Sequence, residues 1–210
     1  MMNTTAMTAS AELLASMPRG FADATHDAQA VFRAVLDALA RPGRLQTLPA
    51  SDGLQAPAPL SRGLTALLLT LLDAETSLHL EGPLASDAAW MYARFHTGVQ
   101  RAAREAADFV AVRAPDASLD GLRQGTDEAP QDGITLIVDT TTLAGQSLVL
   151  RGPGIEHTQR IGLCGLPAAF WQARIAQQRH FPRGVDLLIV CGSQLIAIPR
   201  STHLTLEAGA

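Results

Sequence analysis

Six histidines and two cysteines are the residues of this 210-residue chain that could bind a metal or act as base and nucleophile. The histidines are widely spaced, with no two inside one helical turn and no HExxH or comparable zinc spacing. Cys164 and Cys191 are too far apart for a local metal or redox motif and form no disulfide framework. We expect both thiols to be reduced and packed in the core. A metal site assembled from distant segments, or a histidine brought beside a cysteine by the fold, stays open.

The chain contains no lysine, and all 16 of its basic residues are arginines. A pyridoxal-phosphate enzyme needs a lysine for its Schiff base, and a P-loop needs a lysine on the phosphates. Both classes of protein are therefore excluded. Arginine binds carboxylates and phosphates well, but it stays charged near neutral pH and cannot serve there as a base. This composition favours a binding or assembly subunit over a self-sufficient catalyst.

Two other signatures of enzymes are incomplete. Gly145-Gln146-Ser147 and Gly192-Ser193 both lack the second glycine of a nucleophile elbow. Gly152-Pro153-Gly154 begins like a dinucleotide-binding fingerprint, but His157 stands where the third glycine should be. We expect a turn that ends a strand there, and the alternative of a phosphate-binding loop stays open.

Three short clusters combine arginine with histidine or hydroxyl side chains: Arg94–Gly98, His180–Asp186 and Pro199–His203. Each is expected at the end of a helix or strand, where α/β proteins bind ligands. One interpretation is that these ends bind an anionic ligand through arginine, histidine and threonine side chains. The candidate residues, which also include an arginine at the end of a predicted strand, are Arg94, His96, Thr97, Arg151, Arg200 and Thr202. The alternative is structural, with Arg94 and His96 at a helix C-terminus and the others in turns and ion pairs.

Helical and strand patterns alternate along the chain. A first helix, capped by Thr25 or Asp27, is expected to end at Arg41-Pro42-Gly43, where proline cannot continue it. Further helices are predicted at 61–72, 86–97 and 166–178, with a shorter one at 119–122. The predicted strands are 44–48, 76–80, 109–112, 134–138, 147–151, 185–190, 195–198 and 202–206. This pattern predicts a three-layer α/β/α sandwich with a mixed sheet, because the segment 185–198 reads as an antiparallel hairpin.

Length and composition predict one α/β domain over residues 21–210. Residues 1–20 are expected to be a flexible tail, in which Leu13 and Leu14 could form a short docking helix. A net charge of −4 and 4% aromatic residues argue against nucleic-acid binding. The chain has no basic signal-peptide region and no apolar run long enough to span a bilayer, which predicts a cytoplasmic protein without a membrane contact.

Several of these segments, in this order, resemble the H subunit of the bacterial carbon–phosphorus lyase core complex, the PhnH family. The stretches FPRGVD and AIPRSTH are quite specific, and the matching segments span nearly the whole chain after residue 20. These segments are Asp27–Gly43, Leu67–Leu80, Arg94–Thr97, Leu150–Ile155, Phe181–Gly192 and Leu195–His203. The resemblance, rather than any single motif, identifies the chain as a member of this family.

The resemblance implies a role in phosphonate catabolism, by which bacteria take phosphorus from compounds with a C–P bond. It implies a degenerate relative of the pyridoxal-phosphate transferase fold without a cofactor site, which agrees with the missing lysine. It also implies a homodimer that joins the G, I and J subunits. That complex couples a phosphonate to the ribose of ATP with release of adenine, before the iron–sulfur J subunit cleaves the C–P bond. No catalytic residues are assigned to the H subunit, so none is carried over and no cofactor is expected.

Three functions follow from these observations. The leading hypothesis is a noncatalytic structural or substrate-handling subunit of the lyase complex. Its rival is a binding module for ATP or a phosphonate that uses the arginine, histidine and threonine clusters. The third is a freestanding enzyme with a histidine site assembled from distant segments. If the chain dimerises, the leucine-rich helix 61–72 and the Trp90–Phe95 face are candidates for the exposed apolar patch, although both could equally be core.

Overall fold

A computed structural model describes residues 17–49 and 51–207 of the chain. The predicted docking helix at Leu13 and Leu14, and with it most of the predicted tail, lies outside the described residues. Among the described residues, no helix is both long and apolar enough to cross a bilayer.

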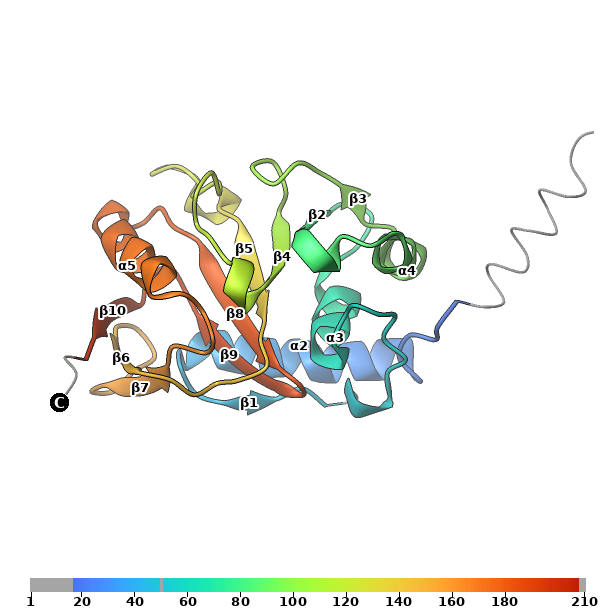
Figure 1. Ribbon diagram of the computed structural model, residues 1–210, viewed down its shortest axis with the longest axis horizontal. Helices are drawn as coiled ribbons and strands as arrows, with labels where there is room; N and C mark the ends of the chain where they lie inside the picture. The colour runs from blue at the N-terminus through green and yellow to red at the C-terminus, as the bar shows by residue number, and fades with distance from the viewer. Residues whose placement is uncertain (1–16, 50, 208–210) are drawn as a thin grey trace, which may run out of the picture.

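A seven-stranded mixed sheet forms the centre of the molecule, in the order β1-β9-β8-β5-β4-β2-β3 (Figure 1). The strands from β8 to β3 run parallel to one another, and β9 runs antiparallel to both β8 and β1. Its strands are β1 Gln46–Thr47, β2 Ser77–Leu80, β3 Gln100–Arg101, β4 Phe109–Arg113, β5 Thr135–Asp139, β8 Asp186–Cys191 and β9 Gln194–Ile198. The predicted α/β class with a mixed sheet and an 185–198 hairpin is thus confirmed.

A second, antiparallel sheet of three strands has the order β10-β6-β7. Its strands are β6 Ser147–Arg151, β7 Gln159–Gly162 and β10 His203–Leu206. The sequence patterns found β6 and β10 as strands but did not show that they leave the main sheet and pair with each other.

The central sheet separates two apolar cores, because successive residues of a strand point to opposite faces. In β8, Leu188 and Val190 belong to the first core, whereas Leu187 and Ile189 belong to the second. Helices α2, α3 and α4 cover the first face, and α5 together with the small sheet covers the second (Figure 1). These helices are α2 Ala24–Ala40, α3 Arg62–Leu71, α4 Asp87–Thr97 and α5 Ala168–Gln177.

The helix ends follow capping chemistry. Ser61 caps α3 and Ser86 caps α4, and Gly98 ends α4 with a left-handed φ of 75°. The cap of α2 is Asp23 rather than Thr25 or Asp27, because its carboxylate accepts from the Thr25 and His26 amides at 3.1 and 2.9 Å. The predicted helix at 119–122 is wrong, since this stretch is a turn with Gly121 at φ +72°.

Helix α3 approaches the β8–β9 turn closely at one glycine. A Cβ atom built on Gly63 would lie 2.1 Å from the carbonyl oxygen of Gly192 and 2.6 Å from Val190 Cγ2. Both distances are far below normal packing distances. The shorter one is to a backbone atom, which cannot move away as a flexible side chain can. Gly63 therefore allows the N-terminal turn of α3 to lie directly on the sheet.

We predict that Gly63→Ala destabilises the protein by roughly 1–3 kcal/mol, the usual cost of overpacking a tight core. This sign opposes helix propensity, which favours alanine over glycine by about 1 kcal/mol. The midpoint of urea unfolding measures the change. Gly53→Ala is the matched control, since a Cβ there would meet nothing within 4 Å, and it should be neutral or slightly stabilising. A Gly63→Ala protein as stable as the wild type would contradict the close approach.

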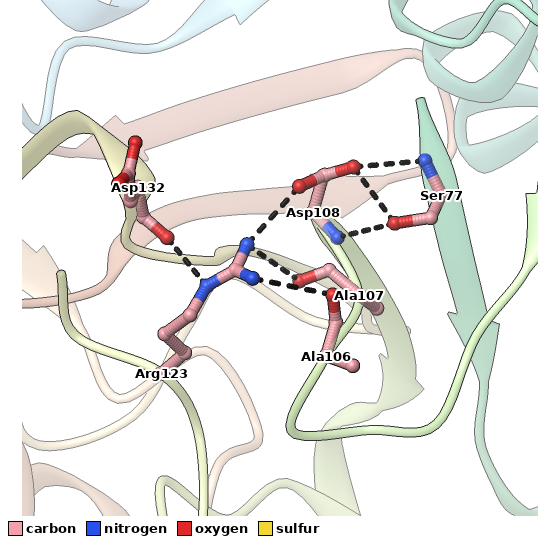
Figure 2. Close-up of polar contacts among 6 residues, drawn as sticks. All are labelled: Ser77, Ala106, Ala107, Asp108, Arg123 and Asp132. Carbon is pink, nitrogen blue, oxygen red and sulfur yellow. Dashed lines mark hydrogen bonds and ion pairs between the residues drawn. The ribbon is translucent and has the colours of Figure 1, made fainter. Parts of the chain in front are cut away.

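A polar network joins the amino-terminal ends of β2 and β4 (Figure 2). Asp108 Oδ2 accepts from the Ser77 hydroxyl at 2.7 Å and from the Ser77 amide at 3.0 Å, and the Asp108 amide donates to Ser77 Oγ at 3.0 Å. Arg123 Nη2 donates to Asp108 Oδ1 at 3.0 Å. The same guanidinium donates to the carbonyls of Ala106, Ala107 and Asp132. The network thus ties two strand ends to the loop that leads into β5.

These contacts shift the pKa of Asp108. Burial alone would raise the pKa of this carboxyl, but the hydrogen bonds from Ser77 and the contact with Arg123 outweigh it and lower the pKa below 3.8. A carboxyl with a depressed pKa stabilises the fold while it is ionised, which is above its pKa in the unfolded chain. That contribution is lost as the pH falls through the lower pKa of the folded state.

We predict that Asp108→Asn lowers stability at pH 7 and that its difference from the wild type shrinks as the pH falls below about 4. Thermal unfolding midpoints of both proteins between pH 7 and pH 3 measure this. Asp52→Asn, at an exposed carboxyl, is the control and should show little difference at any pH. A difference between Asp108→Asn and wild type that stays constant with pH would count against the network.

Candidate functional site

Two charged side chains meet where β4 and β5 end, at the carboxyl edge of the parallel strands. The register pairs Arg113 with Asp139, the last residues of these strands. Arg113 Nη1 lies 3.4 Å from Asp139 Oδ2, and Arg113 Nη2 donates to the Pro59 carbonyl at 2.6 Å. Ser61, the cap of α3, donates its hydroxyl proton to Asp139 Oδ1 at 2.7 Å. Open α/β sheets bind their ligands outside this edge, so the arrangement is a candidate functional site.

Asp139 is the unusual member of this group. Its side chain is only 1% exposed, and its Oδ2 atom has no hydrogen-bond donor among the described residues. Burial raises the pKa of Asp139, although the hydrogen bond from Ser61 and the charge of Arg113 act in the opposite direction. A buried carboxyl group with a perturbed pKa is a common mark of a binding or catalytic position.

A pocket of about 360 Å³ opens beside Asp139. Thr140 lines the pocket, and its hydroxyl donates to the Cys164 carbonyl at 2.7 Å. Gly165, at φ +73°, lies against that hydroxyl, where a built Cβ would be only 3.0 Å from Thr140 Oγ1. The lining residues are Pro83, Arg113, Ala114, Pro115, Asp116, Asp139, Thr140, Thr141 and Gly165. Such a pocket can accept a hydroxyl or amino group at Asp139 and an anionic oxygen at Arg113.

The side chains at this site already have partners within the fold. Ser61 is engaged as a helix cap and as a donor to Asp139, and Arg113 donates to the Pro59 carbonyl and contacts Asp139. Within residues 17–49 and 51–207, no three His, Cys, Asp or Glu side chains lie together as a metal site would require.

Cys164 lies in the core as expected, whereas Cys191 is only partly buried. Cys164 is fully buried, and its thiol is 3.2 Å from the Gly162 carbonyl. Burial, with a smaller contribution from Cys191, raises the pKa of Cys164 to about 12. A thiol with this pKa stays protonated at neutral pH and is a poor nucleophile.

Three of the predicted anion-binding residues occupy the last turn of α4. His96 Nε2 lies 3.0 Å from the Pro18 carbonyl, and Thr97 donates to the Ala93 carbonyl at 2.7 Å. Arg94 is exposed and lines a separate pocket between α4 and β3. His96 and Thr97 therefore already have backbone partners, whereas no carboxylate among the described residues pairs with Arg94.

The other three lie near the small sheet. Arg200 binds the carboxylate of Asp186 with Nε and Nη2, the shorter contact being 2.5 Å. Thr202 is buried, and its hydroxyl has no partner among the described residues. Arg151 is exposed at the end of β6, opposite His203 of β10.

The six predicted residues thus form two groups rather than one site. Figure 1 shows α4 and β3 at one end of the molecule and β6 and β10 at the other. The carboxyl-edge group of Ser61, Arg113 and Asp139 was missed by sequence reasoning. A usable signal was present, since two neighbouring apolar strands, FVAVR and TLIVD, each end on a charge of opposite sign.

Comparisons with known proteins agree on one family. Residues 19–205 match the family described as bacterial phosphonate metabolism protein (PhnH). The alpha-D-ribose 1-methylphosphonate 5-triphosphate synthase subunit PhnH of Rhizobium meliloti (strain 1021) is 36% identical over 191 residues, which is 89% of this chain and 94% of that protein. The putative C-P lyase subunit protein HtxG of Stutzerimonas stutzeri is 33% identical over 180 residues, covering 85% of this chain and 86% of that protein. These matches span both apolar cores and the carboxyl edge.

We predict that the stability of the Asp139→Asn protein increases relative to that of the wild type as the pH rises from about 4 towards neutrality. A carboxyl whose folded pKa lies above its unfolded value keeps its proton in the folded state, so ionisation at higher pH weakens the wild type. Asparagine has the same shape and does not titrate. Urea unfolding of both proteins at pH 4 and pH 8 measures the effect. The opposite trend would show that Arg113 and Ser61 outweigh the burial of Asp139.

Proposed function

The chain belongs to the PhnH family of bacterial phosphonate metabolism proteins, and we propose that it is a subunit of a carbon–phosphorus lyase complex. The observation that carries this function is the match over residues 19–205, together with 36% identity to a named synthase subunit of nearly equal length. It acts in the catabolism of organic phosphonates. Its step is the coupling of a phosphonate to the ribose of ATP, before the C–P bond is cleaved.

We propose further that the subunit contributes by binding rather than by catalysis. Asp139 and Arg113 offer one acceptor and one cation at the edge of the pocket, with no histidine, lysine or ionised thiol beside them among the described residues. Such a set can position a polar ligand or a segment of a partner subunit. The chemistry would then lie with the other subunits of the complex.

The assembly that we propose is a homodimer that joins the G, I and J subunits in the cytoplasm. The fold that we propose is a degenerate pyridoxal-phosphate transferase fold. One support is the long mixed sheet, in which β9 runs antiparallel to both of its neighbours, β1 and β8. The other is the absence of lysine from the sequence. The exposed side chains of Phe32, Leu36 and Phe95 are candidates for the contacts between subunits.

The second candidate function is an anion-binding module made from Arg94, His96, Thr97, Arg151, Arg200 and Thr202. One observation favours it for the exposed members: Arg94 and Arg151 form no ion pair with a carboxylate of the described residues. Arg200 is less available, because an anion would have to compete with Asp186 for its guanidinium. The two groups would act as separate sites.

We predict that deletion of the gene abolishes growth on methylphosphonate as the sole phosphorus source and leaves growth on phosphate unchanged. Purification of a tagged chain from the complemented strain should recover partner subunits in fixed stoichiometry. A strain that carries Asp139→Asn should assemble the complex but grow more slowly on methylphosphonate, because an amide replaces the carboxyl group at the edge of the pocket. Normal growth of the clean deletion on methylphosphonate would refute the subunit role.

A further inference from the structure

A pocket lies between α4 and the edge strand β3. Figure 1 shows these two elements at the opposite end of the molecule from the small sheet. The volume of the pocket is about 460 Å³, within the range of 300–1,000 Å³ that is common for small-ligand sites. Trp90 and Arg94 project from α4 one helical turn apart, and Arg101 comes from β3. The full lining is Trp90, Met91, Arg94, Val99, Gln100 and Arg101.

The charge of this lining is entirely positive. Arg94 and Arg101 line the pocket, whereas no aspartate or glutamate does. Neither arginine is within ion-pair distance of a carboxylate of the described residues. Two guanidiniums that share one concave surface repel each other, and an anion bound between them would remove that repulsion. The geometry of guanidinium suits a phosphoryl group in particular, because it can donate two parallel hydrogen bonds.

The remaining wall is apolar and aromatic. The guanidinium of Arg101 lies 4.9 Å from the centroid of the Trp90 ring, which holds this arginine against the pocket wall. Val99 is buried beneath, and Met91 is exposed at the rim. Trp90 Nε1 is buried and has no acceptor among the described residues. Positive donors beside an aromatic and aliphatic surface are the features that a phosphorylated sugar or nucleoside needs.

We propose that this pocket binds the polyphosphate group of a ribose 5-triphosphate compound, with Arg94 and Arg101 on the phosphates and Trp90 and Met91 against the sugar or base. The inference deepens the proposed function and rests on it for the class of ligand, because the name of the Rhizobium meliloti relative includes a 5-triphosphate. The role of the subunit would then be to hold the charged end of substrate or product. The pocket differs from the carboxyl-edge site, which offers an acceptor at Asp139.

The test is isothermal titration calorimetry of the full chain with ATP, with inorganic triphosphate and with methylphosphonate at low salt. ATP and triphosphate should both bind, and ATP should bind more tightly because of the apolar wall. Arg94→Ala and Arg101→Ala should each weaken ATP binding roughly tenfold or more, since each removes a charge-assisted contact. Arg33→Ala is the matched control, an exposed arginine of α2 outside the pocket, and should bind as the wild type does. Thermal unfolding of each variant shows whether it has folded.

The outcomes separate this inference from the proposed function. No heat with any of the three probes, or an equal loss in Arg33→Ala and Arg94→Ala, would overturn the pocket proposal while co-purification of the complex still stands. Loss of partner subunits from Arg94→Ala and Arg101→Ala, without ATP binding by the wild type, would identify the surface as a protein interface and also overturn it. Tight binding of ATP that is weakened by added salt and by both pocket variants supports it.

Discussion

A buried carboxylate at the end of β5 is the constraint on which the rest of the arrangement depends. Asp139 is 1% exposed, and a charge at this depth is costly unless neighbouring groups compensate for it. Its compensation comes from β4, through Arg113, and from the cap of α3, through Ser61. Each partner is placed by a separate element, so the register of β4 on β5 and the position of α3 must both be right. Even so, one carboxylate oxygen stays without a hydrogen-bond donor among the described residues.

The position of α3 follows in turn from the absence of a side chain at Gly63. A Cβ there would collide with the carbonyl of Gly192, so only glycine lets the helix start this close to the β8–β9 turn. Ser61, two residues earlier, is thereby brought within 2.7 Å of Asp139. The packing at Gly63, the cap at Ser61 and the carboxyl-edge site therefore depend on one another. A change that moves α3 away from the sheet would also remove the donor on which Asp139 depends.

Local patterns in the sequence predicted most of the elements but not the sites. The leucine spacing and Ser61 identified α3, and the apolar runs identified β5 and β8, because these signals are carried by consecutive residues. Strand β3 has two residues, both exposed, and offers no such signal. Asp186 and Arg200 were read as parts of two different clusters, although the hairpin pairs Leu187 with Ile198 and so joins them. Asp139 and Arg113 are 26 residues apart and meet only through the parallel register, which no local pattern reveals.

The roles of the arginines follow from the partners of each side chain rather than from their total number. Arg104 binds Glu81, Arg123 binds Asp108 and Arg200 binds Asp186, so each ties a strand or loop end to its neighbour. Such guanidiniums are structural, and their charge is already balanced. Arg94 and Arg101 are different, because they share one pocket wall with no described carboxylate beside them. Charge that is left unbalanced on a concave surface is the physical distinction between an arginine that holds the fold together and one that is available for a ligand.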